Sequence, residues 1–208
     1  MWGSNRRQQK RNCAKRGKVL KPVKVGICGL GTVGGGTFNV LQRNAAEIAR
    51  RAGRRIQIEQ IGMRRPNPAC DTKGMHVTAD VFEVATNPEI DIVIELIGGY
   101  DVAYKLVMTA IENGKHVVTA NKALIAVHGN EIFAAAQEKN VMVAFEASVA
   151  GGIPIIKALR EGLSANKINW LAGIINGTGN FIMTEMREKG RDFQDVLAEA
   201  QALGYAEA

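Results

Sequence analysis

The sequence has few of the residues that build disulfide frameworks, metal sites and membrane spans. Its three cysteines, Cys13, Cys28 and Cys70, are odd in number and scattered, which favours a reducing compartment over a disulfide framework. The three histidines show no metal-ligand spacing, and no apolar run approaches the ~20 residues needed to cross a bilayer. We therefore expect a cytoplasmic chain with no membrane partner, 208 residues being enough for one full domain and part of a second.

Acidic residues are absent from the first 21 positions, which hold eight basic ones: Arg6, Arg7, Lys10, Arg11, Lys15, Arg16, Lys18 and Lys21. Without these eight, 19 basic groups face 20 acidic ones, so the net charge of +7 belongs to the tail and the body is nearly neutral. This distribution argues against a nucleic-acid partner for the body.

The tail, residues 1–21, has three interpretations. It is a disordered basic arm for anionic polymers, an arginine-rich targeting segment, or a non-native stretch translated from ahead of a start at Leu20. We favour the third. The amino-terminal mass of the native protein tests it, and a start before Gly17 would contradict it.

Residues 23–36, VKVGICGLGTVGGG, are the most informative stretch. The apolar residues 25–28 predict a strand, and a helical pattern covers residues 37–52. Between them, Gly29 would allow a tight turn, Gly31 the close approach of a phosphate, and Gly34 the packing of helix on strand. A glycine turn between a strand and a helix predicts a dinucleotide site with its pyrophosphate at the helix N-terminus.

Apolar strands and helices then alternate along the chain. Strands are predicted at residues 56–63, 90–97, 115–120 and 141–145, helices at residues 80–86, 102–113 and 124–139, and a loop at residues 66–78. Such alternation predicts an α/β fold with a doubly wound parallel sheet that binds ligands at the carboxyl ends of its strands.

The end of the second predicted strand indicates which dinucleotide binds. NAD sites usually place an acid there, but this chain has Gly62-Met63-Arg64-Arg65, and Glu59 lies too early. An arginine at that position can pair with a 2′-phosphate, so Arg64 favours NADP. The alternatives are that the arginines only solvate a loop, or that NAD is also used.

Two later segments are candidates for chemistry. Lys122 directly follows the strand at residues 115–120, where it could donate a hydrogen bond to a substrate carbonyl, although a surface lysine at a helix start is the plainer interpretation. The small residues within 146–154 would let the backbone fold tightly, so that successive carbonyls could converge beside the Glu146 carboxylate around a hard cation. A hinge between domains would explain them too.

The carboxyl-terminal part is predicted to continue with a strand at residues 168–175, a polar turn at 176–180 and a helix at 181–189. Thr178 offers a free hydroxyl in that turn. It suits a ligand contact, although turn formation alone would also explain it.

Together these stretches resemble one family. GLGTVGGG, TANKALIA, EASVAGGIPII, GIINGTGNFI and AEAQALGYAEA follow one another as in bacterial homoserine dehydrogenases, over residues 22–208. The resemblance implies NAD(P)-dependent interconversion of L-aspartate 4-semialdehyde and L-homoserine, on the pathway to threonine, methionine and isoleucine. It also implies a Rossmann domain at residues 22–147, the start of an α+β substrate and dimerisation domain, incomplete, at residues 148–208, and a homodimer in the full-length form.

The resemblance assigns roles position by position. It places the cofactor on Gly29, Gly31, Thr32, Val33, Gly34 and Arg64, with Lys122 at the junction of cofactor and substrate. It places a monovalent cation such as sodium on the Glu146 side chain and the carbonyls of Val149, Gly151 and Ile153. It places homoserine on Thr178 and Glu207, a carboxylate that suits an ammonium group.

The sequence departs from the family pattern at Ala208, ahead of the Asp-Pro turn and of the lysine that the family uses as proton donor. We therefore expect a fragment that binds NADP with little turnover, because hydride transfer needs a fixed carbonyl and a proton source. The alternative is a non-enzymatic NADP-binding module or a pseudogene product. A dehydrogenase with a cysteine nucleophile is disfavoured, because neither Cys28 nor Cys70 has a flanking histidine.

Overall fold

The computed structural model describes residues 20–174 and 176–206, and the chain divides into two compact units after Ile156. All but the last two residues of the predicted basic tail lie outside the described residues. The domain boundary predicted after residue 147 precedes the observed division. Within the described residues, no helix is both long enough and apolar enough to span a membrane.

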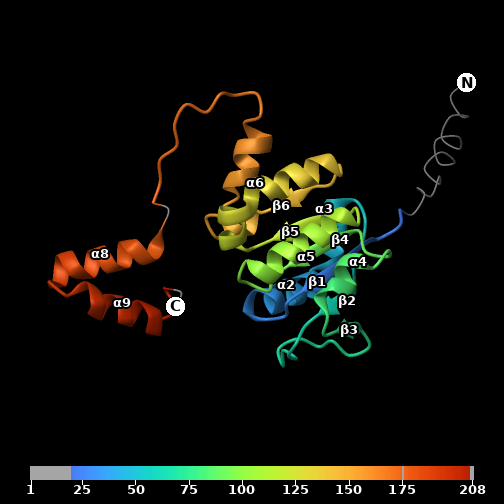
Figure 1. Ribbon diagram of the computed structural model, residues 1–208, viewed down its shortest axis with the longest axis horizontal. Helices are drawn as coiled ribbons and strands as arrows, with labels where there is room; N and C mark the ends of the chain where they lie inside the picture. The colour runs from blue at the N-terminus through green and yellow to red at the C-terminus, as the bar shows by residue number, and fades with distance from the viewer. Residues whose placement is uncertain (1–19, 175, 207–208) are drawn as a thin grey trace, which may run out of the picture. The chain divides into compact units, whose positions relative to one another are not determined.

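The first unit is built on a six-stranded sheet in the order β3-β2-β1-β4-β5-β6, with every neighbouring pair parallel (Figure 1). The strands are β1 (Val23–Cys28), β2 (Ile56–Gly62), β3 (His76–Thr78), β4 (Ile92–Glu95), β5 (His116–Thr119) and β6 (Val143–Ala144). The helices are α2 (Thr32–Arg43), α3 (Ala45–Ala52), α4 (Val81–Thr86), α5 (Asp101–Glu112) and α6 (Lys122–Glu138), and the 3-10 turn η1 (Glu146–Ser148) follows β6. This strand order is that of a dinucleotide-binding sheet, and it confirms the predicted α/β fold.

The sheet is buried on both faces, because successive side chains of a strand point to opposite sides. On one face Val25 and Ile27 of β1 pack with Phe38 of α2. On the other face Cys28 belongs to a cluster that includes Val84 of α4 and residues of α5 and α6. Burial on both faces explains why the strands are nearly continuous apolar runs in the sequence.

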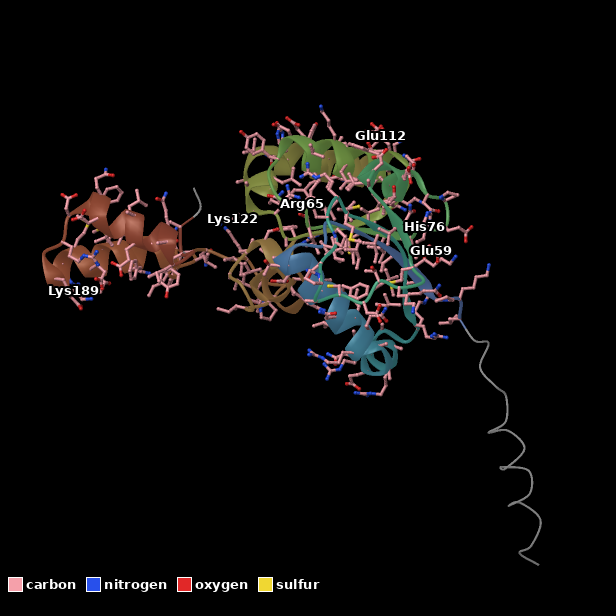
Figure 2. The ribbon with its side chains drawn as sticks, turned by 90° about the horizontal axis from the view of Figure 1, so that it is seen from below. Glu59, Arg65, His76, Glu112, Lys122 and Lys189 are labelled. Carbon is pink, nitrogen blue, oxygen red and sulfur yellow. The ribbon has the colours of Figure 1, made fainter. Side chains whose placement is uncertain are left out.

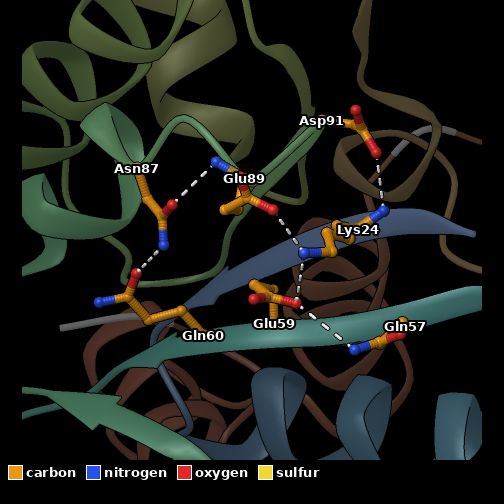
Figure 3. Close-up of polar contacts among 7 residues, drawn as sticks. All are labelled: Lys24, Gln57, Glu59, Gln60, Asn87, Glu89 and Asp91. Atoms are coloured by element: carbon orange, nitrogen blue, oxygen red, sulfur yellow. Dashed lines mark hydrogen bonds and ion pairs between the residues drawn. The ribbon is translucent and has the colours of Figure 1, made fainter.

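Polar contacts join the strands where they begin (Figure 3). The Lys24 ammonium lies 2.7 Å from the Glu89 carboxylate and 3.3 Å from that of Glu59, and the Lys24 amide donates to Asp91 at 2.8 Å. The Glu89 contact, with that of Glu59, raises the pKa of Lys24. These contacts hold β1 and β2 to the segment ahead of β4, at the edge opposite the carboxyl ends of the strands.

Two predictions about local structure in this unit were wrong. The helix predicted at residues 37–52 is two helices, and the first begins earlier, at Thr32, because packing on the sheet outweighs the low helix propensity of its glycines. The break falls at Asn44, whose backbone is not helical. The loop predicted at residues 66–78 contains β3, which pairs with β2 through contacts that its own short sequence does not signal.

The second unit contains a pair of helices. After the short α7 (Ile155–Lys157) and the π-helical turn η2 (Ala158–Gly162), the chain forms α8 (Gly177–Lys189) and α9 (Phe193–Ala202). The residues buried between them are Ile182, Val196 and Ala200.

Two further predictions failed in this unit. Residues 168–174 form no strand, and the side chains of Trp170 and Ile174 are 81% and 85% exposed, because the described residues place no neighbouring strand beside them. The turn predicted at residues 176–180 is the start of α8, where the Asn176 side chain accepts from the Gly179 amide at 2.6 Å.

Candidate functional site

A cleft of about 900 Å³ opens at the carboxyl ends of the strands in the first unit. It is lined by residues 29–32 after β1, residues 62–68 after β2, residues 79–82 around the start of α4, and residues 96–98 after β4 with Val102. Strand order reverses between β1 and β4, and this is the point at which open α/β sheets bind their ligands. The cleft is therefore the candidate functional site.

The glycine turn forms one wall of this cleft, and its conformation requires residues without a side chain. Gly29 has a φ of +95° and donates its amide to the Gly62 carbonyl at 2.8 Å. A Cβ on Gly34 would lie 1.9 Å from the Gly29 carbonyl oxygen, so only glycine fits there. A Cβ on Gly31 would meet nothing within 4 Å. The space beside Gly31 is thus open to a ligand, as the approach of a phosphate requires, and the turn fits a dinucleotide.

The arginine loop, residues 64–70, follows β2, and its residues 64–68 line the same cleft as the glycine turn. Arg64 and Arg65 both line the cavity and are exposed. In Figure 2 the labelled Arg65 and Lys122 lie toward one side of the unit, and Glu59 and His76 lie toward the other. Because Arg64 lines the cavity, the structure brings it to the same cleft as Gly29, Gly31 and Thr32.

A buried carboxylate organises the loops at the next strand end. Glu95, at the end of β4, is fully buried and accepts from the Ile97 amide at 2.9 Å and from the Thr119 hydroxyl at 2.6 Å. The Thr119 oxygen in turn accepts the Asn121 amide at 3.0 Å, and the Asn121 side chain donates to the Gly99 carbonyl. Both carboxylate oxygens have partners, so the loops after β4 and β5 are held to one another.

The burial of this region also makes the thiol of Cys28 unreactive. Burial, together with the nearby Glu95 charge, raises the pKa of the Cys28 thiol to about 12. Cys28 is therefore protonated at neutral pH and unsuited to act as a nucleophile.

Lys122 is the first residue of α6 and is exposed, with Asn121 as the helix cap that accepts from the Leu124 amide at 3.1 Å. Lys122 does not line the cleft, whereas Gly98 does. The Asn121 side chain donates to the carbonyl of Gly99, the residue that follows Gly98 in the loop after β4. The structure thus puts Lys122 at the carboxyl edge of the sheet, outside the lining of the cleft.

The predicted cation segment follows β6. One Glu146 carboxylate oxygen accepts the Ile156 amide at 2.9 Å, and the Ile153 carbonyl accepts the Ile155 amide at 2.8 Å. Ala150 and Gly151 both have positive φ, of 55° and 57°, which is uncommon for alanine and turns the backbone sharply. Among the described residues no three His, Cys, Asp or Glu side chains gather into a metal site. The donors in this segment are a carboxylate and backbone carbonyls, a set that fits a hard cation.

Thr178 lies in the first turn of α8, in the second unit, and its hydroxyl donates to the Tyr205 carbonyl. The ring of Tyr205 packs edge-on against Phe181, with centroids 5.3 Å apart. Glu207, the other predicted substrate residue, lies outside the described residues.

Sequence reasoning missed the polar residues that hold these loops. Glu95 is the one charged residue within the apolar strand end IVIELI, which is a usable signal for a buried polar contact. Asn67 stands between Pro66 and Pro68, a pattern typical of a turn, but nothing in the sequence says which backbone its side chain contacts.

The strand order, the switch-point cleft and the glycine turn define a nucleotide-binding domain of the Rossmann class. The family model described as the homoserine dehydrogenase NAD binding domain matches residues 29–146, and the model described as homoserine dehydrogenase matches residues 154–208. The chain belongs to the homoserine dehydrogenase family.

Individual relatives agree with this assignment. The chain is 80% identical over 189 residues to homoserine dehydrogenase of Pseudomonas aeruginosa, which covers 91% of this chain and 44% of that protein. A crystal structure of a homoserine dehydrogenase from Thiobacillus denitrificans has 66% identity and a TM-score of 0.81, over 90% of this chain and 44% of that one. A hyperthermophilic archaeal homoserine dehydrogenase in complex with NADPH has 28% identity and a TM-score of 0.72. The match covers 90% of this chain and 63% of that one. The chain thus spans less than half the length of the curated relatives it matches.

Proposed function

We propose that this chain forms the NADP-binding part of an enzyme that interconverts L-aspartate 4-semialdehyde and L-homoserine. The observation that carries the proposal is that the glycine turn and two arginines line one cleft at the switch point of the sheet. A helix N-terminus favours a pyrophosphate, and a guanidinium pairs with a phosphate through two parallel hydrogen bonds. Membership of the family supports the reaction.

Each cofactor residue has a role that follows from its place. Thr32 and Val33 open α2, where the first backbone amides have no partner within the helix and can donate to the pyrophosphate. Arg64 would pair with the 2′-phosphate that distinguishes NADP from NAD. The nicotinamide, when bound, supplies the hydride, and Lys122 would hold the substrate carbonyl beside it by donating a hydrogen bond.

The experiment that tests this proposal is a fluorescence titration of the 208-residue chain with NADPH and NADH. Arg64→Ala should weaken NADPH about tenfold or more and leave NADH nearly unchanged, because it removes a charge-assisted contact made only to the 2′-phosphate. Arg65→Ala is the matched control, since it removes a neighbouring guanidinium from the same cleft. A preference for NADPH that survives Arg64→Ala would refute the role of Arg64.

The substrate contacts are proposed for Thr178 and Glu207. Because the Thr178 hydroxyl hydrogen is directed at the Tyr205 carbonyl, its oxygen can accept a hydrogen bond from the homoserine ammonium group. In the whole enzyme, Thr178→Val should raise the KM for homoserine while NADPH affinity stays constant. An unchanged KM would remove Thr178 from the substrate site.

A monovalent cation such as sodium is proposed on Glu146 and the carbonyls of Val149, Gly151 and Ile153. The support is the oxygen-only donor set and the sharp turn at Ala150 and Gly151. Replacement of sodium chloride by tetramethylammonium chloride at constant ionic strength should lower the melting temperature of the wild type. It should leave the melting temperature of Glu146→Gln unchanged. Equal responses of the two chains would exclude the site.

The remaining proposals concern the whole enzyme, and family membership is their support. We place it on the cytoplasmic pathway to threonine, methionine and isoleucine, as a homodimer. Sedimentation of the enzyme from its source would test the dimer, and a monomeric mass would contradict it.

A further inference from the structure

Asn67 joins the two loops that line the cleft. Its side-chain amide nitrogen lies 2.9 Å from the Leu30 carbonyl oxygen and 3.3 Å from that of Gly31. Its side-chain oxygen accepts the Ala69 amide at 3.0 Å, so the same side chain also fixes its own loop. One side chain therefore contacts both the glycine turn and the arginine loop.

These contacts set the direction of the amides in the glycine turn. In a planar trans peptide the carbonyl and the N–H point in opposite directions. With the Leu30 carbonyl turned toward Asn67, the Gly31 N–H is turned away from it. The Gly31 carbonyl also accepts the Gly35 amide at 2.8 Å, so the first hydrogen bond of α2 already orients the Thr32 N–H, and the Asn67 contact adds to it. Asn67 thus orients the Gly31 amide at the start of α2 and reinforces the orientation of the Thr32 amide.

The rest of the arginine loop is fitted to α2 just as closely. A Cβ on Gly35 would lie 2.5 Å from the Asn67 amide nitrogen, so the absence of a side chain at Gly35 makes room for Asn67. The Cys70 thiol donates to the Gly35 carbonyl at 3.7 Å, and the Asn39 side chain donates to the Ala69 carbonyl at 3.0 Å. The loop that carries Arg64 is therefore held against the first two turns of α2.

We propose that Asn67 is a positioning residue that orients the Gly31 amide of the glycine turn and anchors the arginine loop. Cofactor affinity and preference for NADP are then coupled through one side chain. Removal of the Asn67 amide takes away the contacts that hold the glycine turn, which should weaken the binding of NADH and NADPH alike. It also takes away the contacts that hold the arginine loop, which should weaken the binding of NADPH alone. The second effect rests on the proposed function of Arg64, and the first does not.

The test is a titration of the 208-residue chain with NADPH and NADH, for wild type and Asn67→Ala. We expect NADH to bind about fivefold to tenfold more weakly, the equivalent of one or two lost hydrogen bonds, and NADPH to lose a further few-fold. The matched control is Asn39→Ala in α2, which removes the side-chain amide that donates to the loop at Ala69 and not to the glycine turn. Its NADH affinity should equal that of wild type.

Amide resonances provide a second measurement that a general loss of stability would not reproduce. Asn67→Ala should shift the Gly31 and Thr32 amide signals, and Asn39→Ala should not. NADH and NADPH affinities within twofold of wild type in Asn67→Ala would overturn the proposal. So would an equal loss of NADH affinity in the two variants. If Arg64→Ala leaves the NADPH preference intact while Asn67→Ala still weakens NADH, the role of Arg64 fails and the orienting role of Asn67 stands.

Discussion

The two units of the chain differ in how much of their apolar sequence is buried. In the first unit each strand lies beside at least one other, and Ile27 is fully buried in the sheet. In the second unit residues 168–174 are as apolar as a strand, yet Ile174 is 85% exposed. The difference shows that an apolar run becomes a strand only where another strand offers its backbone hydrogen bonds.

The largest contrast should come from equivalent truncations in the two units. Ile27→Ala should lower the free energy of unfolding of the first unit by about 2–5 kcal/mol, because it removes a buried side chain and leaves a cavity. Ile174→Ala should change the stability of the chain by no more than about 0.5 kcal/mol. Urea denaturation of both variants measures the two effects. A cost at Ile174 comparable to that at Ile27 would mean that residues 168–174 are packed in solution.

A smaller effect is expected from acid in the second unit. Hydrogen bonds from Lys189 and Arg191 lower the pKa of Glu185. A folded pKa below the unfolded value means that this contribution is present above the unfolded pKa, about 4.3 for glutamate, and is lost as pH falls through the folded value. Methyl signals of Ile182 and Val196, followed by NMR from pH 6 to pH 3, should therefore report loosening of α8 and α9 below about pH 4.

The control for this acid effect is Glu185→Gln, which removes the titrating group. In this variant the methyl signals of Ile182 and Val196 should change much less below pH 4 than they do in the wild type. If the variant and the wild type loosen at the same pH, other carboxylates carry the acid sensitivity and the contacts of Glu185 do not.

Most of the first unit could be predicted from the sequence. The ends of β1, β2, β4, β5 and β6 were all predicted to within two residues, because a strand buried on both faces is a short apolar run between turns. The glycine turn was predicted because Gly29 and Gly34 stand at positions where only glycine fits, and their spacing between a strand and a helix is visible in the sequence. What failed here was β3, whose three residues gain their structure from pairing with β2, and the single helix predicted at residues 37–52, which is two helices.

The site was less predictable than the fold. Arg64 could be placed at the cleft because it follows a strand end, and strand ends share an edge of the sheet. Asn67 and Glu95 could not be assigned, because their roles depend on contacts with Leu30 and Thr119, far away in the sequence. In the second unit the strand prediction at residues 168–175 failed because periodicity does not report whether a partner strand exists.

The central claim is that the glycine turn of the first unit is a dinucleotide site, and Gly31→Ala tests it most directly. Apart from its two chain neighbours, the added Cβ meets no protein atom within 4 Å, and the backbone at Gly31 is extended, with φ of −70° and ψ of −154°, so the fold should be unaffected. Gly36→Ala, also without a neighbour for its Cβ, is the matched control within α2. We predict that Gly31→Ala melts at the wild-type temperature yet binds NADPH at least about tenfold more weakly, because its methyl group fills the space a phosphate needs. Equal NADPH affinities for Gly31→Ala, Gly36→Ala and wild type would contradict the account.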